Sequence, residues 1–408
     1  MKRRITELKV GLDFGREILP VGRLAVRDHT IYFEYERSFI QKKLEISPLR
    51  LPLRPGVSAF EARPFEGLAG VFSDSLPDGW GRLLFDRLLR SQDIFPSEIT
   101  SLDRLAHVGF HGMGALVYEP DYSPSDIEDG FIDLDKLAQQ AREVLTGSSE
   151  EIFQELLSLN GSSAGARPKA LIGVDQTRRN ISHGAKQLAE GFEPWLVKFP
   201  NSQDGLDSGV IEYVYALMAK EAGVGISETH LFAAGKGGGY FATKRFDRDG
   251  TNRYHMHTVS GLLHSDFRTP SLDYEDLLML TGQLTRDIRE VEKMYRLAVF
   301  NVLAHNRDDH AKNFSFLMDE KGVWKLSPAY DLTFSNGPGG EQSTMVLGEG
   351  RNPCDKQLIK LGLEAGLPKA LVEESVAQTR YALSRWKSLA NEYGISPSTR
   401  DLISKKLT

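Results

Sequence analysis

The most constraining feature of this chain is a short polar segment in which Asp308 and Asn313 stand in the pattern Asp-x4-Asn. A second carboxylate follows in Tyr330-Asp331-Leu332, beyond a stretch whose pattern predicts a short pair of strands. Kinases that hold Mg-ATP need such a set, because one Asp accepts the proton of the acceptor hydroxyl while one Asn and one Asp bind the metal ions that bridge the phosphates. The order of the three side chains matches that template, although the surrounding residues differ from those of ordinary protein kinases.

Composition places the 408-residue chain among soluble globular proteins and leaves room for more than one structural unit. The formal net charge of -6 gives no global basic field for nucleic acid, so any DNA contact is expected from a local patch or from a partner. Cys354 is the single cysteine, which excludes an internal disulfide, fits a reducing cytoplasm and is interpreted as a bystander. The sequence shows no run of about 18 apolar residues and no signal-peptide pattern after Met1–Arg4, so neither a membrane span nor a secretory leader is expected.

Local periodicity predicts a β-rich beginning, a mixed α/β middle and a mostly helical end. Short strands are expected within 5–36, and a polar connector with two prolines over 119–130 marks the first boundary. The other predicted elements are helices near 80–90, over 133–159, from Asp207 or Ser208 to Gly223, over 286–304 and over 368–392, strands over 168–174, 194–200 and 239–247, and a hairpin of 314–318 with 323–327. These boundaries predict three domains, residues 1–120, 121–250 and 251–408.

Lys198 lies on a short apolar strand whose alternation places Trp195, Val197 and Phe199 on one face. A lysine there is suited to reach phosphate oxygens as a point charge, and the alternative is an edge-strand lysine that guards against aggregation. The downstream set of Asp, Asn and Asp favours the phosphate role. Glu212, on the following helix, could pair with Lys198 as a helix glutamate does in kinases, or could be an ordinary solvated residue.

A loop of small residues, Gly161-Ser-Ser-Ala-Gly-Ala-Arg-Pro-Lys169, precedes the 168–174 strand. Small side chains let backbone N–H groups approach phosphate oxygens, and Lys169 adds positive charge. The segment is not a Walker A loop, because no Gly-Lys-Ser/Thr order closes it, and a flexible turn is the alternative. Its position ahead of the Lys198 strand favours a loop that covers phosphates.

Two other segments could be interpreted as further functional sites, and the sequence favours neither interpretation. Gly235–Gly239 lies between apolar stretches and predicts a flexible hairpin turn rather than a phosphate site. His305, Asp308, Asp309 and His310 could form a metal cluster for hydrolysis, but no zinc spacing is satisfied. A hydrolase would also have no use for the lysine strand and the small-residue loop. His310 is expected to pack and hydrogen-bond within its loop.

Together these motifs resemble the HipA family of serine/threonine kinases, the toxin halves of toxin–antitoxin pairs. The resemblance covers most of the chain and rests on Phe65–Gly81, on Asp308–Asn313 and on Pro328–Leu332. It implies an α+β, protein-kinase-like fold of two lobes with an extra β-rich N-terminal subdomain. Residues 1–120 would form that subdomain, with the phosphate loop and lysine strand in an N-lobe over 121–250 and the catalytic loop in a helical C-lobe over 251–408.

By position, the resemblance implies that Asp308 is the catalytic base, that Asn313 and Asp331 bind Mg²⁺, and that Lys198 binds the phosphates of ATP. Ser162, or less readily Ser163, would be autophosphorylated within the phosphate-covering loop. Lys244-Arg245-Phe246 would form a hinge that meets adenine largely through backbone groups. The full set of expected ATP contacts is Ser162, Ser163, Ala164, Gly165, Ala166, Lys169, Lys198, Lys244, Phe246 and His310.

The resemblance also implies partners: a small helix-turn-helix antitoxin similar to HipB that carries the DNA contacts, and an aminoacyl-tRNA synthetase as substrate. The chain departs from the best-known members at Arg167-Pro168, where they have Gln-Glu, and its two adjacent serines leave the modified position open. Two other functions stay possible: a non-catalytic kinase-fold co-repressor acting beside its DNA-binding partner, and a kinase for a small molecule.

Overall fold

The computed structural model describes residues 5–124, 131–147, 154–159, 165–184, 188–201, 205–269 and 271–407. The chain packs as two compact units. The first consists of Met1–Gln203, Ala242–Ser265 and Leu317–Val323, and the second of Asp204–Phe241, Asp266–Phe316 and Trp324–Thr408. The three domains expected from the sequence, divided near 120 and 250, stay a prediction.

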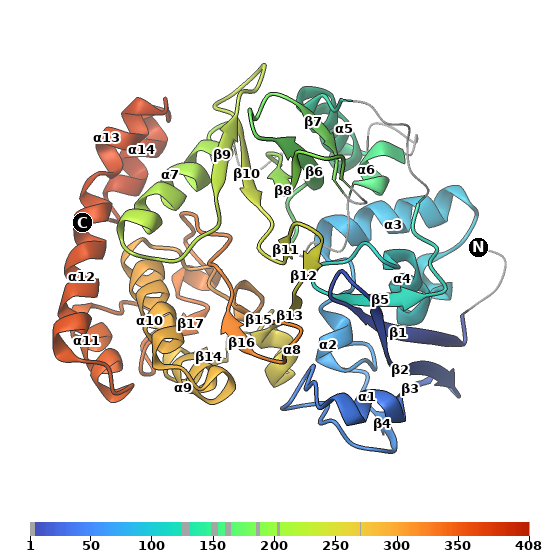
Figure 1. Cartoon of the computed structure of the whole chain (residues 1–408). Helices are drawn as coiled ribbons and strands as arrows, with labels where there is room; N and C mark the ends of the chain where they lie inside the picture. The colour runs from blue at the N-terminus through green and yellow to red at the C-terminus, as the bar shows by residue number, and fades with distance from the viewer. Residues whose placement is uncertain are drawn as a thin grey trace. The chain divides into compact units, whose positions relative to one another are not determined.

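The first unit begins with a five-stranded sheet in the order β4-β3-β2-β1-β5 (Figure 1). Its strands are β1 Glu7–Asp13, β2 Ile18–Arg27, β3 Thr30–Tyr35, β4 Val57–Ala59 and β5 Leu116–Glu119. The alternation read from the sequence is confirmed, because Leu8, Val10 and Leu12 are all buried. Helix α4 (Ser101–Val108) packs on β1 and β5, and Thr100 and Asp103 form a capping box at its start.

Three shorter elements lie before, within and after the stretch 65–81 that carries the family resemblance, in that order. They are α1 Arg37–Lys42, α2 Gly70–Ser73 and the 3-10 turn η1 Pro96–Glu98. The helix predicted near 80–90 is confirmed as α3, Gly79–Ser91, and the side chain of Asp78 accepts a hydrogen bond from the Gly79 N–H at its start.

The second sheet has the order β7-β6-β8-β10-β9. In the first unit it contains β6 Lys169–Asp175, β7 Ile181–His183 and β8 Phe192–Lys198, and the chain leaves the second unit along β10 Tyr240–Lys244. The prediction of a single helix over 133–159 is wrong. The stretch is divided into α5 Leu134–Thr146 and α6 Gln154–Ser158, because Gly147 takes a left-handed conformation that ends α5. After β10 come β11 Arg248–Asp249, β12 Asn252–Arg253, β13 His255–Thr258 and α8 Val259–Leu263.

The second unit is mostly helical, as expected. It contains α7 Ser208–Glu221, β9 Thr229–Phe232, β14 Leu272–Asp273, α9 Tyr274–Thr285, α10 Ile288–Leu303, the 3-10 turns η2 Ala311–Asn313 and η3 Pro338–Gly340, β16 Trp324–Leu326, β17 Thr344–Met345, α11 Asp355–Glu364, α12 Lys369–Ser384, α13 Trp386–Glu392 and α14 Pro397–Ser404. Strand β15, Ser315–Met318, begins in this unit and ends in the first. The long helix predicted over 368–392 is divided after Ser384. There Trp386 turns into the core and its indole N–H donates to the Arg400 carbonyl at 3.1 Å.

Helix α10 delivers the chain to the Asp-x4-Asn segment. Asp287 caps its start by accepting from the Arg289 N–H, and Val291, Met294, Tyr295 and Ala298 are buried at the helical spacing seen in the sequence. The helix ends at Ala304, and His305 takes a left-handed φ of 54° that turns the chain out of the helix. Across the described parts of the chain, no helix combines the length and apolarity needed to cross a bilayer.

Candidate functional site

The loop after α10 presents one exposed carboxylate between two buried residues. Asn306 and Asp309 are each at most 2% exposed, whereas Asp308 lies at the surface. The loop continues into η2, where the Asn313 N–H donates to the His310 carbonyl at 2.8 Å. The segment that carries Asp308 is therefore anchored on both sides. A side chain that accepts a proton from an incoming hydroxyl must be held in position in this way.

Asn313 is tied directly to the backbone of Asp308. Its Nδ2 donates to the Asp308 carbonyl at 2.7 Å, which orients the carboxamide across the turn. This contact leaves the amide oxygen as the group that could ligate a metal ion. The structure thus brings together the two ends of the Asp-x4-Asn pattern.

Asp331 has an unusual backbone conformation, and the two residues before it are anchored by hydrogen bonds. Its φ is 58°, in the left-handed region that Asp tolerates better than most residues. Tyr330 donates its hydroxyl to the Lys312 carbonyl at 2.7 Å, next to Asn313, and Ala329 donates its N–H to the Gly225 carbonyl at 2.8 Å. Such a conformation costs on the order of 1–3 kcal/mol and persists where the surroundings determine it, as at many functional sites.

Two lysines lie opposite each other on the second sheet. Lys169 of β6 pairs with Lys198 of β8 in the antiparallel ladder, so both side chains are on the same face. Trp195, Val197 and Phe199 occupy the other face and are buried, which confirms the predicted alternation. The two ammonium groups add positive charge to this face of the ladder.

The second half of the predicted phosphate loop contacts the start of α3 within the first unit. The Trp80 N–H donates to the Gly165 carbonyl, and its indole N–H donates to the Lys169 carbonyl, both at 3.2 Å. Gly79 lies against Ala166 with a positive φ of 38°. The signature stretch identified in the sequence therefore supports Gly165, Ala166 and Lys169 directly. The remaining loop candidates, Ser162, Ser163 and Ala164, lie outside the described residues.

Gly79→Ala is expected to disturb this support. A Cβ at Gly79 would lie 2.6 Å from Ala166 Cα and 2.7 Å from the Gly165 oxygen, so backbone must move. We expect a stability loss of about 1–3 kcal/mol and weaker ATP binding, measured by thermal unfolding and by nucleotide titration. Gly366→Ala is the matched control, because Gly366 also has a positive φ but has open space around its Cβ position. Equal effects of the two changes on ATP binding would contradict the support role.

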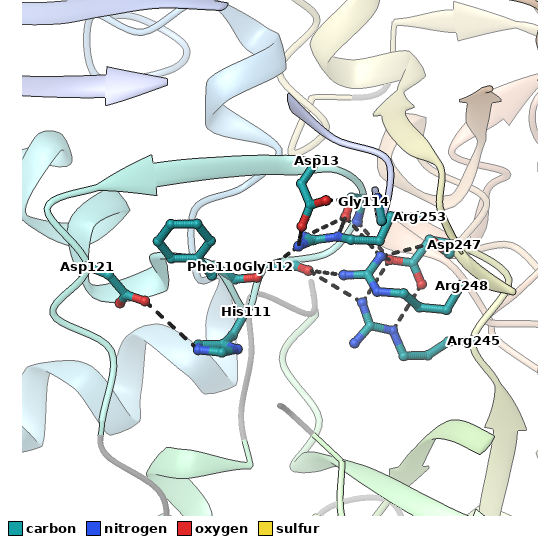
Figure 2. Close-up of polar contacts among 11 residues, drawn as sticks. Asp13, Phe110, His111, Gly112, Gly114, Asp121, Arg245, Asp247, Arg248 and Arg253 are labelled. Atoms are coloured by element: carbon teal, nitrogen blue, oxygen red, sulfur yellow. Dashed lines mark hydrogen bonds and ion pairs between the residues drawn. The ribbon is translucent and has the colours of Figure 1, made fainter. Parts of the chain in front are cut away.

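The predicted hinge, Lys244-Arg245-Phe246, is fixed by a buried arginine cluster. Figure 2 shows Arg245, Arg248 and Arg253 converging on the loop of Phe110 to Gly114. The arginines donate to carbonyl oxygens: Arg248 Nη2 to Gly112 at 2.9 Å and Arg253 Nη2 to Gly114 at 3.0 Å. Arg253 also pairs with Asp13 at 2.9 Å.

Asp247 lies at the centre of this cluster and is completely buried. It accepts from Arg245, from Arg248 and from the Gly114 N–H at 2.7–2.8 Å. Burial alone would raise the pKa of Asp247, but the two guanidiniums outweigh it and hold the pKa well below its usual range. The hinge backbone is thus set by buried ion pairs, while the ammonium of Lys244 is engaged by Glu193 at 2.6 Å. This arrangement favours backbone contacts to a ligand over a contact from the Lys244 side chain, and Phe246 is half-buried beside it.

The alternative metal cluster at 305–310 is not supported by the geometry. His305 stacks on Phe334 with ring centroids 5.4 Å apart, and burial lowers its pKa to about 4. The Asp309 carboxylate is buried and engaged in hydrogen bonds, and the His310 ring packs 5.3 Å from Phe267. Within the described ranges, no group of three His, Cys, Asp or Glu side chains could hold a metal ion.

Two further sequence interpretations have clear outcomes. Gly235–Gly239 connects β9 to β10, which are neighbours in the sheet, so the predicted hairpin turn is confirmed. Glu212 is 2% exposed, so the interpretation as a solvated residue is wrong. Its pairing with Lys198 stays a prediction, because the two residues belong to different units.

Comparison with known proteins decides the family. The HipA-like C-terminal domain matches residues 161–386, more than half of the chain, and the HipA N-terminal domain matches residues 17–119. The chain belongs to the HipA family. A solved structure of HipA from Shewanella oneidensis MR-1, in a complex of HipA, HipB and operator DNA, has a similar fold with a TM-score of 0.69 at 18% identity. That similarity covers 98% of this chain and 95% of the Shewanella chain, and it confirms the predicted kinase-like fold with an N-terminal subdomain.

Two Sinorhizobium fredii proteins that carry kinase designations are similar over part of the chain. Y4dM is 30% identical over 153 residues, which are 34% of this chain and 36% of Y4dM. Y4mE is 25% identical over 224 residues, which are 52% of this chain and 50% of Y4mE. The chain thus spans about a third to a half of the length of these relatives.

Several contacts within each unit could not be found from the sequence motifs. Gly79 and Trp80 belong to the stretch 65–81 that carries the family resemblance. Their contacts with residues 165–169 join segments that are far apart in the sequence. Asp247 with its arginines, and Tyr274 with Asp309, form through tertiary structure. The sequence contains one indication of these contacts. The Asp-x4-Asn pattern uses Asp308 and leaves the adjacent Asp309 without a predicted role.

Proposed function

We propose that this HipA-family protein is an ATP- and Mg²⁺-dependent serine/threonine protein kinase that acts as the toxin of a toxin–antitoxin pair. The observation that carries the proposal is the loop geometry. Asp308 is exposed between anchored neighbours, and Asn313 is fixed to its backbone at 2.7 Å. Asp331 has a left-handed conformation and follows Tyr330, whose hydroxyl donates to the Lys312 carbonyl at 2.7 Å. The kinase designations of Y4dM and Y4mE support the same activity.

The residues present fit the cofactor. Mg²⁺ prefers oxygen ligands and binds through one or two side chains plus substrate phosphates, which the Asn313 amide oxygen and the Asp331 carboxylate can provide. Bound Mg-ATP would supply the phosphoryl group and neutralise the charge that develops on it. Asp308 would accept the proton of the acceptor hydroxyl. In the other unit, Lys169 and Lys198 share one face of the ladder and would hold phosphate oxygens.

The decisive experiment is incubation of the purified protein with labelled ATP, Mg²⁺ and a cell extract, followed by identification of labelled bands. A kinase of this type labels at least one protein in the extract. Label that passes only to small molecules would support the small-molecule kinase instead. The absence of ATP turnover with a folded protein would favour the co-repressor.

An aminoacyl-tRNA synthetase is the proposed substrate, and its support is the family resemblance. Purified synthetases from the host, offered one at a time with labelled ATP, test it directly. Arg167-Pro168 differs from the best-known members, so a different synthetase from theirs is expected. Labelling of proteins other than synthetases would contradict this part of the proposal and leave the kinase activity standing.

A small helix-turn-helix protein similar to HipB is the proposed partner, with the pair in the cytoplasm. The Shewanella structure contains HipB and operator DNA together with HipA. With a net charge of -6, the isolated chain should bind DNA weakly, and the partner should supply the phosphate contacts. Gel-shift titrations over a range of salt concentrations distinguish the cases. Tight, salt-sensitive DNA binding by the isolated chain would contradict the proposal that the partner supplies the DNA contacts.

Autophosphorylation of Ser162, or less readily Ser163, is expected to occur in trans and to switch the enzyme off. A phosphoserine adds about −1.5 to −2 charge, which would repel the γ-phosphate and could pair with Arg167 or Lys169. Ser162→Ala should stay active longer during incubation with Mg-ATP, and Ser163→Ala is the matched control. Peptide mapping by mass spectrometry locates the phosphate. A fully phosphorylated protein that binds ATP as before would contradict the switch.

A further inference from the structure

A continuous series of buried hydrogen bonds connects the residues on the two sides of the exposed Asp308. The Asn306 Nδ2 donates to Asn301 Oδ1 at 2.9 Å, and the Asn301 Nδ2 donates to the Tyr274 hydroxyl at 3.0 Å. The Tyr274 hydroxyl in turn donates to Asp309 Oδ2 at 2.6 Å. All four side chains are at most 2% exposed. The series therefore begins at the residue two before Asp308 and ends at the residue directly after it.

Asp309 is also the anchor for the segment that begins at Gln342. The Gln342 Nε2 donates to Asp309 Oδ2 at 3.0 Å, and the N–H groups of Ser343 and Thr344 donate to Oδ1 at 2.9 and 3.1 Å. The Thr344 hydroxyl donates to the Asp309 carbonyl. One carboxylate thus accepts four hydrogen bonds from two separate parts of the chain.

The fold explains why these groups meet. Strands β14 and β17 pair in parallel, with Leu272 opposite Thr344, so Tyr274 and the 342–344 segment arrive on the same side of the loop. Asn301 comes from the last turn of α10, just before the chain leaves the helix. A buried carboxylate without partners would be costly, and burial raises the pKa of Asp309 to about 7 against the opposing effect of its donors.

We propose that Tyr274 and Asp309 are positioning residues for phosphoryl transfer, which hold the Arg307–Asp308 backbone so that the Asp308 carboxylate meets the acceptor hydroxyl. The proposal rests on the proposed role of Asp308 as the base. Neither residue contacts the reacting atoms in this scheme. Their effect arises because a displacement of about 1 Å at a catalytic group can cost on the order of 10²-fold in rate.

The test compares Tyr274→Phe with Tyr295→Phe. Tyr295 is also fully buried in the second unit, and its hydroxyl donates to the Leu358 carbonyl at 3.0 Å, away from the loop. Both changes remove one buried hydroxyl, and Tyr274→Phe should cost more stability because its hydroxyl bonds a carboxylate and also accepts from Asn301. Tyr274→Phe should lower kcat by about 10- to 100-fold while the Kd for Mg-ATP stays within about twofold. Tyr295→Phe should change neither.

Hydrogen exchange gives a second readout that needs no activity. The backbone amides of Arg307–His310 should exchange faster in Tyr274→Phe than in the parent or in Tyr295→Phe. Unchanged exchange there would overturn the positioning role, whatever the protein's activity. A parent protein without any turnover would contradict the proposed function but leave the exchange comparison valid.

Gln342→Met serves where Tyr274→Phe does not fold. It removes the Nε2 donor to Asp309 with little change in shape, and Gln342 is 3% exposed. The same split is expected: a lower kcat, a similar nucleotide affinity and faster exchange at 307–310. A variant that loses nucleotide affinity and kcat together, with unchanged exchange at the loop, would show a general structural role and overturn the proposal.

Discussion

Asp308→Asn is expected to reduce phosphoryl transfer by about 10²–10⁴-fold, the usual effect of losing a general base. The change keeps the size of the side chain and removes its ability to accept a proton. Asp308 is exposed, so the fold should lose little stability. The carbonyl that receives the Asn313 amide belongs to the backbone and is unaffected. Initial rates of protein labelling, together with thermal unfolding, give both quantities.

The matched control is Glu374→Gln, which removes one exposed carboxylate from α12. It carries the same change in net charge without touching the loop, and its rate should equal that of the parent. ATP binding should persist in Asp308→Asn, because Asn313 and Asp331 are intact. Turnover close to the parent's in a folded Asp308→Asn protein would show that another group accepts the proton.

The sequence was sufficient where the structure depends on local spacing. The Asp-x4-Asn pattern lies within one loop, and the helix predicted over 286–304 delivers it as expected. The alternation around Lys198 correctly separated the buried face from the lysine face, because period two follows from strand geometry alone. These features need no knowledge of distant residues.

The sequence was insufficient where side chains far apart in the chain share one hydrogen bond. Tyr274 and Asp309 meet because β14 pairs with β17, and such a two-residue strand pair has no recognisable pattern. In the sequence, Asp247 is only a polar residue at the end of a predicted strand. Its buried contacts with Arg245 and Arg248 are visible only in the folded structure. The end of α5 at Gly147 could have been anticipated, since glycine in a left-handed conformation is a frequent helix terminator.

The loop combines an exposed reactive group with buried support, and this contrast separates the two adjacent aspartates. Asp308 is open to an acceptor, whereas Asp309 accepts four hydrogen bonds in the core. Exchange of their roles is excluded by this geometry, because a carboxylate so engaged cannot meet a protein substrate. In the proposed mechanism, the adjacent pair therefore consists of one chemical residue, Asp308, and one structural residue, Asp309.

Asp331→Ala is expected to abolish the part of ATP stabilisation that requires Mg²⁺. A ligand at 100 times its Kd stabilises the folded state by about 2.7 kcal/mol, and in the parent this increment should appear mainly when Mg²⁺ accompanies ATP. Without the Asp331 carboxylate, only one of the two side chains that would hold Mg²⁺, Asn313, would remain. Differential scanning calorimetry with ATP, with Mg²⁺ and with both measures the increment.

Asp331→Gly separates the loss of the ligand from the loss of a tolerated backbone conformation. Because Asp331 has a φ of 58°, alanine should add strain and lower the Tm of the unliganded protein, whereas glycine adopts this conformation readily. Both variants lack the carboxylate, so both should lose the Mg²⁺-dependent increment although their unliganded Tm values differ. An Asp331→Gly protein that Mg-ATP stabilises as strongly as it does the parent would remove Asp331 from the metal site.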